Sequence, residues 1–226
     1  MSEFYQSIAD HYDDIFPLSD TLRKFLFSFG IMKEDFILDV GCATGEVALY
    51  LAQYARNVTG IDLDPNLIKI ANFKKDERGR DNVRFLAGDM NDLDSIFSRG
   101  QFRIIACLGN TLVHLLSIDA INDFFRKVST VLSDDGLFVF QILNYEKLLA
   151  RKTAELPLID NNKITFERRY DHETYKLLLV FNTSLRVKAT SETINNSIPL
   201  FPIRQTELMK MSSRRLFRSI RFLGGF

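Results

Sequence analysis

Between residues 35 and 143 the chain alternates short apolar runs with longer segments of helical periodicity, and this alternation constrains its fold most. The runs are rich in Ile, Val and Phe, as strands buried on both faces of a sheet are. They cover 36–40, 57–61, 83–87, 102–108 and 136–143. Segments between them, such as 118–132, repeat apolar residues every three or four positions, which is typical of helices packed on a sheet. The alternation predicts an α/β fold with a doubly wound, mostly parallel sheet and helices on both faces.

After residue 143 the pattern becomes that of antiparallel strands. Segments 163–170 and 177–187 predict a hairpin, and 198–203, interrupted by two prolines, predicts a short edge strand. A last helix is expected at 205–217. We interpret the chain as one domain, 1–226, in which 145–203 is an inserted segment. This segment would form a small antiparallel β cap over the carboxyl ends of the parallel strands and select the substrate.

Two features of the expected cap bear on binding. Arg168, Arg169 and Tyr170 occupy adjacent positions of one expected strand, so at most two of them face a site. The apolar residues Leu177, Leu179 and Phe181 are expected on one face of the cap. Three roles stay open for this face: lining a pocket, packing on the core, or contacting a second subunit in a homodimer.

Charge and cysteine content narrow the partners and the compartment. Lys and Arg together number 29, as do Asp and Glu, which argues against broad attraction to nucleic acid or an anionic membrane. The N-terminus lacks the pattern of a secretory signal, and no apolar run reaches the length of a membrane span. Cys42 and Cys107 lie far apart and form neither a disulfide framework nor a zinc pattern. We therefore expect a cytoplasmic protein that holds no metal and contacts neither membrane nor nucleic acid.

A glycine-containing loop follows the first expected strand. Gly41 and Gly45 stand four positions apart, between this strand and the next helix. Glycine lets the backbone turn sharply and approach a ligand without a Cβ in the way, and the helix start offers unpaired N–H groups. Asp62 follows the second strand and Asp89 the third. Both carboxylates are therefore expected at the same edge of the sheet, with Asp62 placed to accept the hydroxyls of a ribose.

Two classes of cofactor bind at such an edge. A dinucleotide site requires further glycines where this chain has Ala43 and Val47, which weakens that interpretation. The segments DVGCATGE at 39–46, GIDLDP at 60–65 and GDM at 88–90 together closely resemble the class I S-adenosylmethionine-dependent methyltransferases. That resemblance implies a Rossmann-like fold, with S-adenosylmethionine as the cofactor and S-adenosylhomocysteine as the product.

The resemblance also assigns cofactor-binding roles. The loop would surround the methionine end of the cofactor with Asp39, Gly41, Cys42, Ala43 and Gly45. Asp62 would hold the ribose, and Leu63 would lie against the adenine. Asp89 would accept a hydrogen bond from the adenine amino group, with the Met90 backbone beside it. The Met90 side chain would either contact the adenine or pack in the core. Residues 4–13 resemble the helix that many of these enzymes fold over the bound cofactor, with Tyr12 as the expected contact.

A narrower resemblance concerns the acceptor side. Residues 107–115 together with 143–145 are similar to the small-molecule enzymes of the glycine N-methyltransferase group. It implies that Leu108 touches the adenine, while Asn110 and His114 approach the active centre. That group carries an arginine where this chain has Leu143, so glycine itself is not the expected acceptor.

The expected function is methyl transfer to an amine or hydroxyl of a small molecule, with His114, Asn110 and Tyr145 as catalytic candidates. A neutral amine attacks without prior loss of a proton, whereas a hydroxyl usually needs a general base. His114 is the candidate base and Tyr145 the positioning group. Two alternatives to the role of general base stay open for His114: it contacts the cofactor, or it is a polar residue at the start of a helix.

Three other functions compete with this one. They are an RNA methyltransferase, a non-catalytic S-adenosylmethionine-binding module and, least favoured, a nicotinamide-dependent oxidoreductase. The fourth strand is followed by LGNT rather than by the Asn-Pro-Pro-Tyr or Pro-Cys pair of RNA enzymes. The resemblance further implies a terminal helix and two strands. Here 218–226 supplies one strand candidate, and the final strand of the sheet is expected to be missing.

Overall fold

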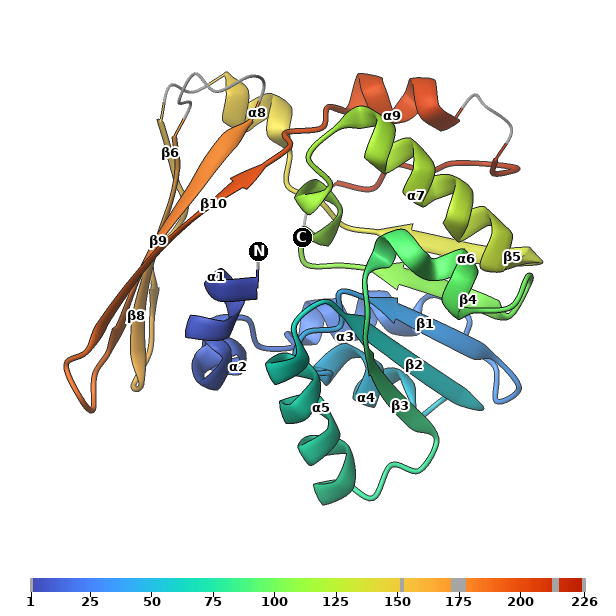
Figure 1. The fold of residues 1–226 in the computed structure, drawn as a ribbon, viewed down its shortest axis with the longest axis horizontal. Coiled ribbons are helices and arrows are strands. Elements are labelled where there is room, and N and C mark those ends of the chain that lie inside the picture. The colour runs from blue at the N-terminus through green and yellow to red at the C-terminus, as the bar shows by residue number, and fades with distance from the viewer. Residues whose placement is uncertain (1, 151–152, 172–177, 213–215, 225–226) are drawn as a thin grey trace.

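The computed structural model describes residues 2–150, 153–171, 178–212 and 216–224. Two sheets make up the molecule, a parallel one and a smaller antiparallel one, with the N-terminal helices lying between them (Figure 1). Within these ranges no helix is long and apolar enough to span a bilayer.

The parallel sheet confirms the predicted α/β fold. Its order is β3-β2-β1-β4-β5. The strands are β1 (Phe36–Val40), β2 (Asn57–Asp62), β3 (Val83–Ala87), β4 (Phe102–Cys107) and β5 (Leu132–Phe140). All neighbouring pairs are parallel. The chain first builds outward from β1 to β3 and then returns to β4 on the other side of β1, so the topological switch point lies between β1 and β4.

One predicted boundary was wrong. The sequence predicted the fifth strand at 136–143, but β5 already begins at Leu132. Leu132 pairs with Phe102 and Leu137 pairs with Ile104, so four residues of β5 lie opposite a single residue of β4. The polar, glycine-containing segment is therefore an irregularity inside the strand pair.

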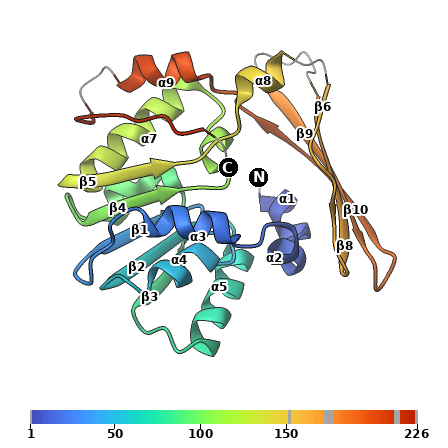
Figure 2. The same ribbon diagram turned by 180° about the vertical axis from the view of Figure 1, so that it is seen from behind.

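Helices cover both faces of the parallel sheet, as predicted. They are α3 (Asp20–Phe27), α4 (Glu46–Leu51), α5 (Pro65–Glu77), α6 (Leu93–Ile96) and α7 (Ile118–Val131). Helices α6 and α7 lie on one face, and α3 and α4 on the other (Figures 1 and 2). Alternate residues of β1 serve the two cores, since Leu38 packs with the α7 side and Ile37 with the α4 side.

The antiparallel sheet has the order β10-β9-β8-β6, with β7 also paired to β8. Its strands are β6 (Thr153–Glu155), β7 (Ile159–Asp160), β8 (Ile164–Asp171), β9 (Leu179–Val187) and β10 (Thr193–Leu200), preceded by α8 (Tyr145–Leu149). The predicted hairpin is β8 and β9, and the predicted edge segment is the end of β10. Pro199 lies in β10, an edge strand, where a missing N–H is tolerated.

The C-terminal part differs from the prediction. Helix α9 (Gln205–Ser212) is shorter than the expected 205–217. Residues 218–224 form no strand, so the strand expected there is absent from the described part of the chain. Residues 225 and 226 lie outside the described residues.

The N-terminal segment connects the two sheets. It consists of α1 (Ser2–Ser7), the 3₁₀ turn η1 (Ala9–His11) and α2 (Tyr12–Ile15). Toward the antiparallel sheet, the rings of Phe4 and Phe181 lie 5.9 Å apart, and Asn196 Nδ2 donates to Ser7 Oγ over 2.7 Å. Toward the parallel sheet, Thr44 Oγ1 donates to Asp13 Oδ1 over 2.6 Å.

Candidate functional site

The glycine loop makes a tight connection between β1 and α4. Gly41 has a φ of +71°, and a Cβ built on it would lie 2.4 Å from the Thr111 side chain. Only glycine fits there, because both the backbone conformation and the space exclude a side chain. Gly45, with a φ of +84°, is the N-cap of α4. The N–H groups of Gly41 and Cys42 both donate to the Ile61 carbonyl, which ties the loop to β2.

Asp62 fixes the far side of this loop from the end of β2. Its Oδ2 accepts from the Ala43 N–H over 2.9 Å, and its Oδ1 accepts from the Asp64 N–H over 3.0 Å. Burial raises the pKa of Asp62, although these backbone N–H groups favour its charged form. Each carboxylate oxygen keeps a further lone pair, so the group can also accept from a ligand hydroxyl.

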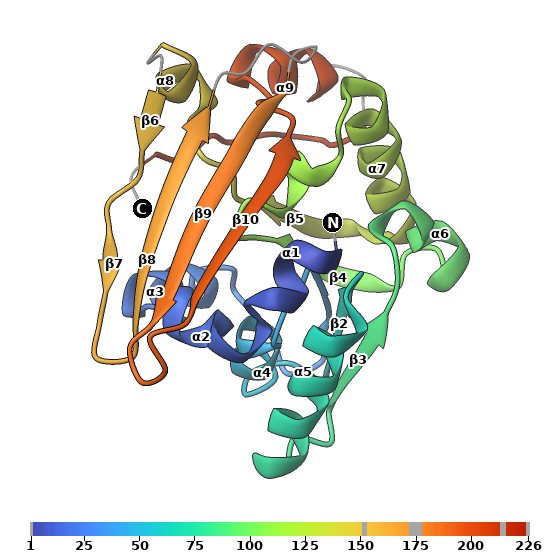
Figure 3. The same ribbon diagram turned by 60° about the vertical axis from the view of Figure 1, so that its left-hand side comes forward.

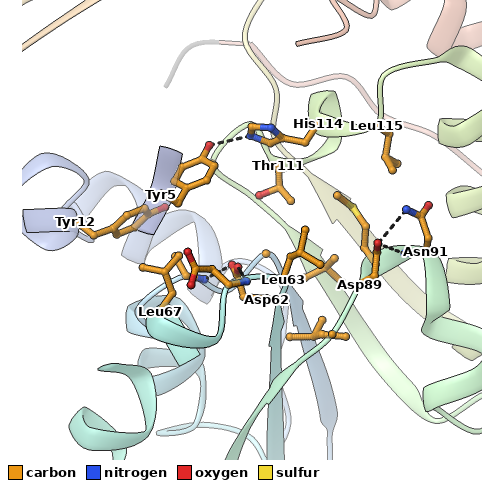
Figure 4. Close-up of a pocket in the computed structure, with 18 residues that line it drawn as sticks. Tyr5, Tyr12, Asp62, Leu63, Leu67, Asp89, Asn91, Thr111, His114 and Leu115 are labelled. Carbon is orange, nitrogen blue, oxygen red and sulfur yellow. Dashed lines mark hydrogen bonds between the residues drawn. The ribbon is translucent and has the colours of Figure 1, made fainter. Parts of the chain in front are cut away.

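A pocket opens at this edge of the sheet (Figure 4). Eight predicted site residues line it, namely Tyr12, Gly41, Ala43, Asp62, Leu63, Asp89, Met90 and His114. Eight further residues with side chains line it and were not predicted: Tyr5, Val40, Ile61, Asp64, Leu67, Asn91, Thr111 and Leu115. Asp64 is also the N-cap of α5, since its Oδ1 accepts from the Asn66 N–H over 2.8 Å. Proximity of Asp64 to Asp62 was the signal in the sequence that could have placed it here.

Four other predicted cofactor residues lie behind the pocket wall rather than in it. Asp39 is buried, its Oδ2 has no hydrogen-bond partner in the described part of the structure, and burial, then Asp62, raises its pKa to about 7. Cys42 is buried, and burial raises the pKa of its thiol. Leu108 is buried in the α4-side core, and Gly45 caps α4. Their backbone and packing shape the loop.

Asp89 and its neighbours form the other acidic side of the pocket. The Asp89 Oδ1 accepts from the backbone N–H and from Nδ2 of Asn91, over 2.8 and 2.9 Å. Met90 lies between them at the start of the 3₁₀ turn η2 (Met90–Asp92). The carboxylates of Asp62, Asp64 and Asp89 give the pocket an acidic lining that suits hydroxyl and amino donors. The same charges would repel a pyrophosphate, which further weakens the dinucleotide interpretation.

The catalytic candidate His114 lies where the pocket meets the N-terminal segment. It ends the 3₁₀ turn η3 (Thr111–His114), and Tyr5 Oη lies 2.8 Å from its Nε2. Its Nδ1 is buried and has no hydrogen-bond partner among the described residues. Burial lowers the pKa of His114 to about 4, so the imidazole is neutral near pH 7. A neutral imidazole in this position can accept a proton.

Asn110 and Tyr145 form a pair beside the pocket. Asn110 has a φ of +70°, its Nδ2 donates to Tyr145 Oη over 2.8 Å, and its Oδ1 accepts from the Leu143 N–H. Neither residue lines the pocket, but Gly109 and Thr111 on either side of Asn110 do. The pair therefore fixes the loop after β4 against the start of α8.

The described residues contain no group of three or more His, Cys, Asp or Glu side chains placed to hold a metal ion. The glycine cradle at the switch point, the carboxylates after β2 and β3 and the buried histidine fit S-adenosylmethionine: an ammonium, ribose hydroxyls and an adenine amino group need acceptors of this kind. This fold and site resemble those of the class I, Rossmann-like S-adenosylmethionine-dependent methyltransferases.

Comparison with known proteins agrees with that class. Residues 37–136, which hold the glycine loop, Asp62, Asp89 and His114, match the family model described as a methyltransferase domain. A curated protein of Geobacillus sp. (strain WCH70) that bears the name methyltransferase is 30% identical over 150 residues, which are 64% of this chain and 59% of the relative. The chain spans between 43% and 59% of the first three curated relatives.

Two solved structures share the fold. The CcbJ methyltransferase from Streptomyces caelestis has a TM-score of 0.76 at 23% identity, over 91% of this chain and 83% of that one. The sugar N-methyltransferase KedS8 from a Streptoalloteichus species has a TM-score of 0.66 at 15% identity, over 94% of this chain and 84% of that one. Both alignments extend beyond the parallel sheet and therefore include the antiparallel one. The narrower resemblance to the glycine N-methyltransferase group stays a prediction.

Proposed function

We propose that this chain transfers the methyl group of S-adenosylmethionine to an amine or hydroxyl of a small molecule. One observation carries the proposal: the pocket joins the acidic cofactor edge, Asp62 and Asp89, to the neutral, buried His114. A donor site and a proton acceptor thus share one space (Figure 4).

The binding roles follow from the donors and acceptors of the pocket. Asp62 accepts from the ribose hydroxyls and Asp89 from the adenine amino group, while Leu63 and Met90 cover the adenine. Gly41 and Ala43 face the methionine end, and Tyr12 covers it from the N-terminal segment. When bound, the cofactor supplies a methyl group that its sulfonium has already activated. The protein needs only to orient the acceptor in line with it and exclude water, which contributes about 7–11 kcal/mol in favourable cases.

His114 takes the proton of a hydroxyl acceptor, or that of an amine after transfer. Tyr5 orients the imidazole through Nε2, and the pair of Asn110 and Tyr145 positions the loop that carries it. We expect His114→Ala to lower turnover more than cofactor affinity, because the imidazole acts on the acceptor. Equal turnover and equal affinity in wild type and variant would make His114 a structural residue.

Residues 145–203 are the proposed cap, and its inner face selects the acceptor. Leu179 and Phe181 are buried in the core of the chain itself, whereas Leu177 lies outside the described residues. Of the three roles considered for this apolar face, Leu179 and Phe181 thus have that of packing on the core. A homodimer and a cytoplasmic location stay predictions.

A small acceptor is favoured over RNA. Tyr5 and Tyr12 of the N-terminal segment line the pocket, and the formal net charge is zero. The similarity in fold to a sugar N-methyltransferase is in keeping with this choice. Steep salt dependence of RNA binding would instead support the RNA methyltransferase.

The test is calorimetric titration of the chain with S-adenosylmethionine and S-adenosylhomocysteine, with NAD as the control. We expect both sulfur ligands to bind and NAD not to bind. Turnover is then assayed on amines and afterwards on hydroxyl compounds. Cofactor binding without turnover on any acceptor would favour the non-catalytic module, and binding of NAD alone would overturn the proposal.

A further inference from the structure

The N-terminal segment is held differently by the two parts of the molecule that it connects. Figure 3 shows α1 and α2 beside the antiparallel sheet, and α1 also contacts α5. Three apolar side chains of the segment are buried in the main core together with residues of that sheet: Phe4, Ile8 and Ile15. Toward the cofactor pocket the buried cluster is small and consists of Ala9, Ala43 and Leu67. Polar contacts therefore matter more on the pocket side.

Asp13 of α2 makes two polar contacts on the pocket side. Its Oδ1 accepts from the hydroxyl of Thr44 over 2.6 Å, and its Oδ2 forms an ion pair with Nζ of Lys74 in α5. Thr44 is buried and lies in the glycine loop, between Ala43 and Gly45. One carboxylate thus joins α2 both to the loop that borders the pocket and to the helix that follows β2.

Lys74 is held in place independently of Asp13. Its Nζ also lies 3.1 Å from Glu46 Oε1, and Arg78 binds the same carboxylate with both terminal nitrogens, over 2.6 and 3.1 Å. Burial acts to raise the pKa of Glu46, but hydrogen bonds from Arg78 and Lys74 hold this pKa below its ordinary value. The Lys74 side chain is 13% exposed, so solvent screens its ion pairs less than those at the surface. Asp13 therefore has a preformed cationic partner on α5.

The next residue, Asp14, contacts the cap instead. Its Oδ1 lies 2.8 Å from Nζ of Lys163, and its backbone carbonyl accepts from Nδ2 of Asn161 over 3.0 Å. The Lys163 side chain is 63% exposed, so this ion pair contributes little to stability. Asp13 and Asp14 are thus adjacent aspartates that contact opposite parts of the molecule, and they form a matched pair for comparison.

Two tyrosines of the same segment line the cofactor pocket, Tyr5 and Tyr12, and Tyr12 directly precedes Asp13 (Figure 4). A ligand that lies between these rings and Asp62 is enclosed by the segment on one side and the glycine loop on the other. Its release requires the segment to separate from the loop. That separation breaks both contacts of Asp13, whereas the contacts of Asp14 lie on the cap and can stay.

We propose that Asp13 is a positioning residue for the cofactor: through Thr44 and Lys74 it holds Tyr12 against the pocket and so limits how fast the cofactor and its product leave. This inference rests on the proposed function and adds to it what controls exchange at the same site. Asp13 does not line the pocket and acts through its neighbours. The hydrogen bond to Thr44 is charge-assisted and the pair with Lys74 is ionic, so the two contacts respond differently to substitution and to salt.

The rate at which S-adenosylhomocysteine leaves the immobilised full chain, measured by surface plasmon resonance, tests the proposal. Asp13→Asn removes the charge, while its amide oxygen can still accept from Thr44, so release should be about threefold faster. Asp13→Ala removes both contacts and should speed release about tenfold. Asp14→Asn makes the same isosteric change at the adjacent position and should release the ligand at the wild-type rate.

Two further measurements distinguish positioning by the ion pair from a merely structural role of Asp13. Raising the salt concentration from about 0.05 to about 0.5 M should speed release from the wild type, because salt screens the ion pair, and should do so less in Asp13→Asn. Lys74→Met should speed release as Asp13→Asn does. The double variant should be no faster than either single variant, because both changes break the same pair.

Wild-type release rates in Asp13→Asn and in Lys74→Met would overturn the proposal, whether or not Asp13→Ala folds. So would an equal acceleration in Asp14→Asn, or effects of Asp13→Asn and Lys74→Met that multiply in the double variant. A wild type that does not bind S-adenosylhomocysteine would contradict the proposed function. The contacts of Asp13 are then tested by hydrogen exchange of residues 2–16 without ligand, which should be faster in Asp13→Ala than in Asp14→Asn, and equal exchange would overturn their role.

Discussion

At the scale of single residues, Asp62 combines a structural role with the proposed role of binding the ribose. Its two oxygens accept from the Ala43 and Asp64 N–H groups and so hold the glycine loop and the turn into α5 in place. Ala43 itself has a φ of +47°, which is unfavourable for a residue with a Cβ. The carboxylate therefore maintains a loop conformation that the local sequence alone disfavours, and the same group is available to the ribose.

Replacing Asp62 with alanine should abolish binding of S-adenosylmethionine. The loss of two charge-assisted acceptors of the ribose corresponds to a decrease in affinity of roughly a hundredfold or more. Calorimetry measures it, and Asp76→Ala, an exposed carboxylate near the end of α5, is the control. Wild-type affinity in Asp62→Ala would refute the assigned role.

The buried His114 predicts a pH dependence of stability. Its pKa is about 4 in the folded chain against 6.5 as the reference value, so between these pH values the unfolded chain binds a proton that the folded chain does not. The stability contribution is therefore fully present above about pH 6.5 and is lost as the pH falls toward 4. The loss amounts to about 3 kcal/mol.

Urea denaturation of the wild type and of His114→Gln at pH 7, 5.5 and 4 measures this loss. The wild type should lose more free energy of unfolding than His114→Gln across the series, because glutamine does not titrate. His11→Gln, outside the pocket lining, is the matched control and should behave as the wild type does. Parallel curves for the wild type and His114→Gln would show that His114 is readily protonated in the folded state.

At the scale of elements, the N-terminal segment owes its order to tertiary contacts. Helix α1 has six residues, far fewer than an isolated helix needs in water. It is held by Phe4 against Phe181, by Ser7 against Asn196 and by Tyr5 against His114. Two of these contacts involve the antiparallel sheet and one the pocket, so the segment connects the pocket to the antiparallel sheet.

Phe4→Ala should release this segment. The change removes a buried ring, which costs about 3–5 kcal/mol where the surroundings cannot collapse. Hydrogen exchange of residues 2–16 should accelerate, and affinity for S-adenosylhomocysteine should fall because Tyr5 and Tyr12 leave the pocket. Glu3→Ala, an exposed neighbour, should change neither quantity. Unchanged exchange in Phe4→Ala would mean that the other contacts suffice.

At the scale of the whole molecule, the bond between Tyr145 and Asn110 connects the cap to the parallel sheet. Tyr145 is 1% exposed at the start of α8, and Asn110 is in the loop after β4. Burial raises the pKa of Tyr145, so its hydroxyl stays protonated. This bond sets the position of the cap's first helix relative to the loop that carries His114.

Tyr145→Phe should lower the free energy of unfolding by about 1 kcal/mol, because the half-buried amide of Asn110 loses this partner. A double-mutant cycle with Asn110→Ala, followed by urea denaturation, separates this interaction from the rest of the two side chains. Additive effects of the two changes would show that the bond contributes nothing to stability.

Local sequence patterns were sufficient to predict the parallel sheet and the sheet edge that carries the proposed cofactor-binding residues. Strands and helices of the α/β unit follow from hydrophobic periodicity, and the carboxyl ends of parallel strands meet at one edge by geometry. Gly41, Asp62 and Asp89 could therefore be brought together from their positions after three strands. The main error there was the start of β5, where an irregular strand pair has the composition of a turn.

The tertiary structure alone decided which distant side chains meet. Tyr5 reaches His114 across 109 positions, Thr183 lies beside Arg168, and Asn196 reaches Ser7 across 189 positions. No periodicity encodes these contacts, because they depend on the register of the antiparallel strands and on how the cap and the N-terminal segment pack against the parallel sheet. The sequence thus placed the proposed cofactor-binding residues at one edge of the sheet, and the packing of the three parts decided which further residues surround the pocket.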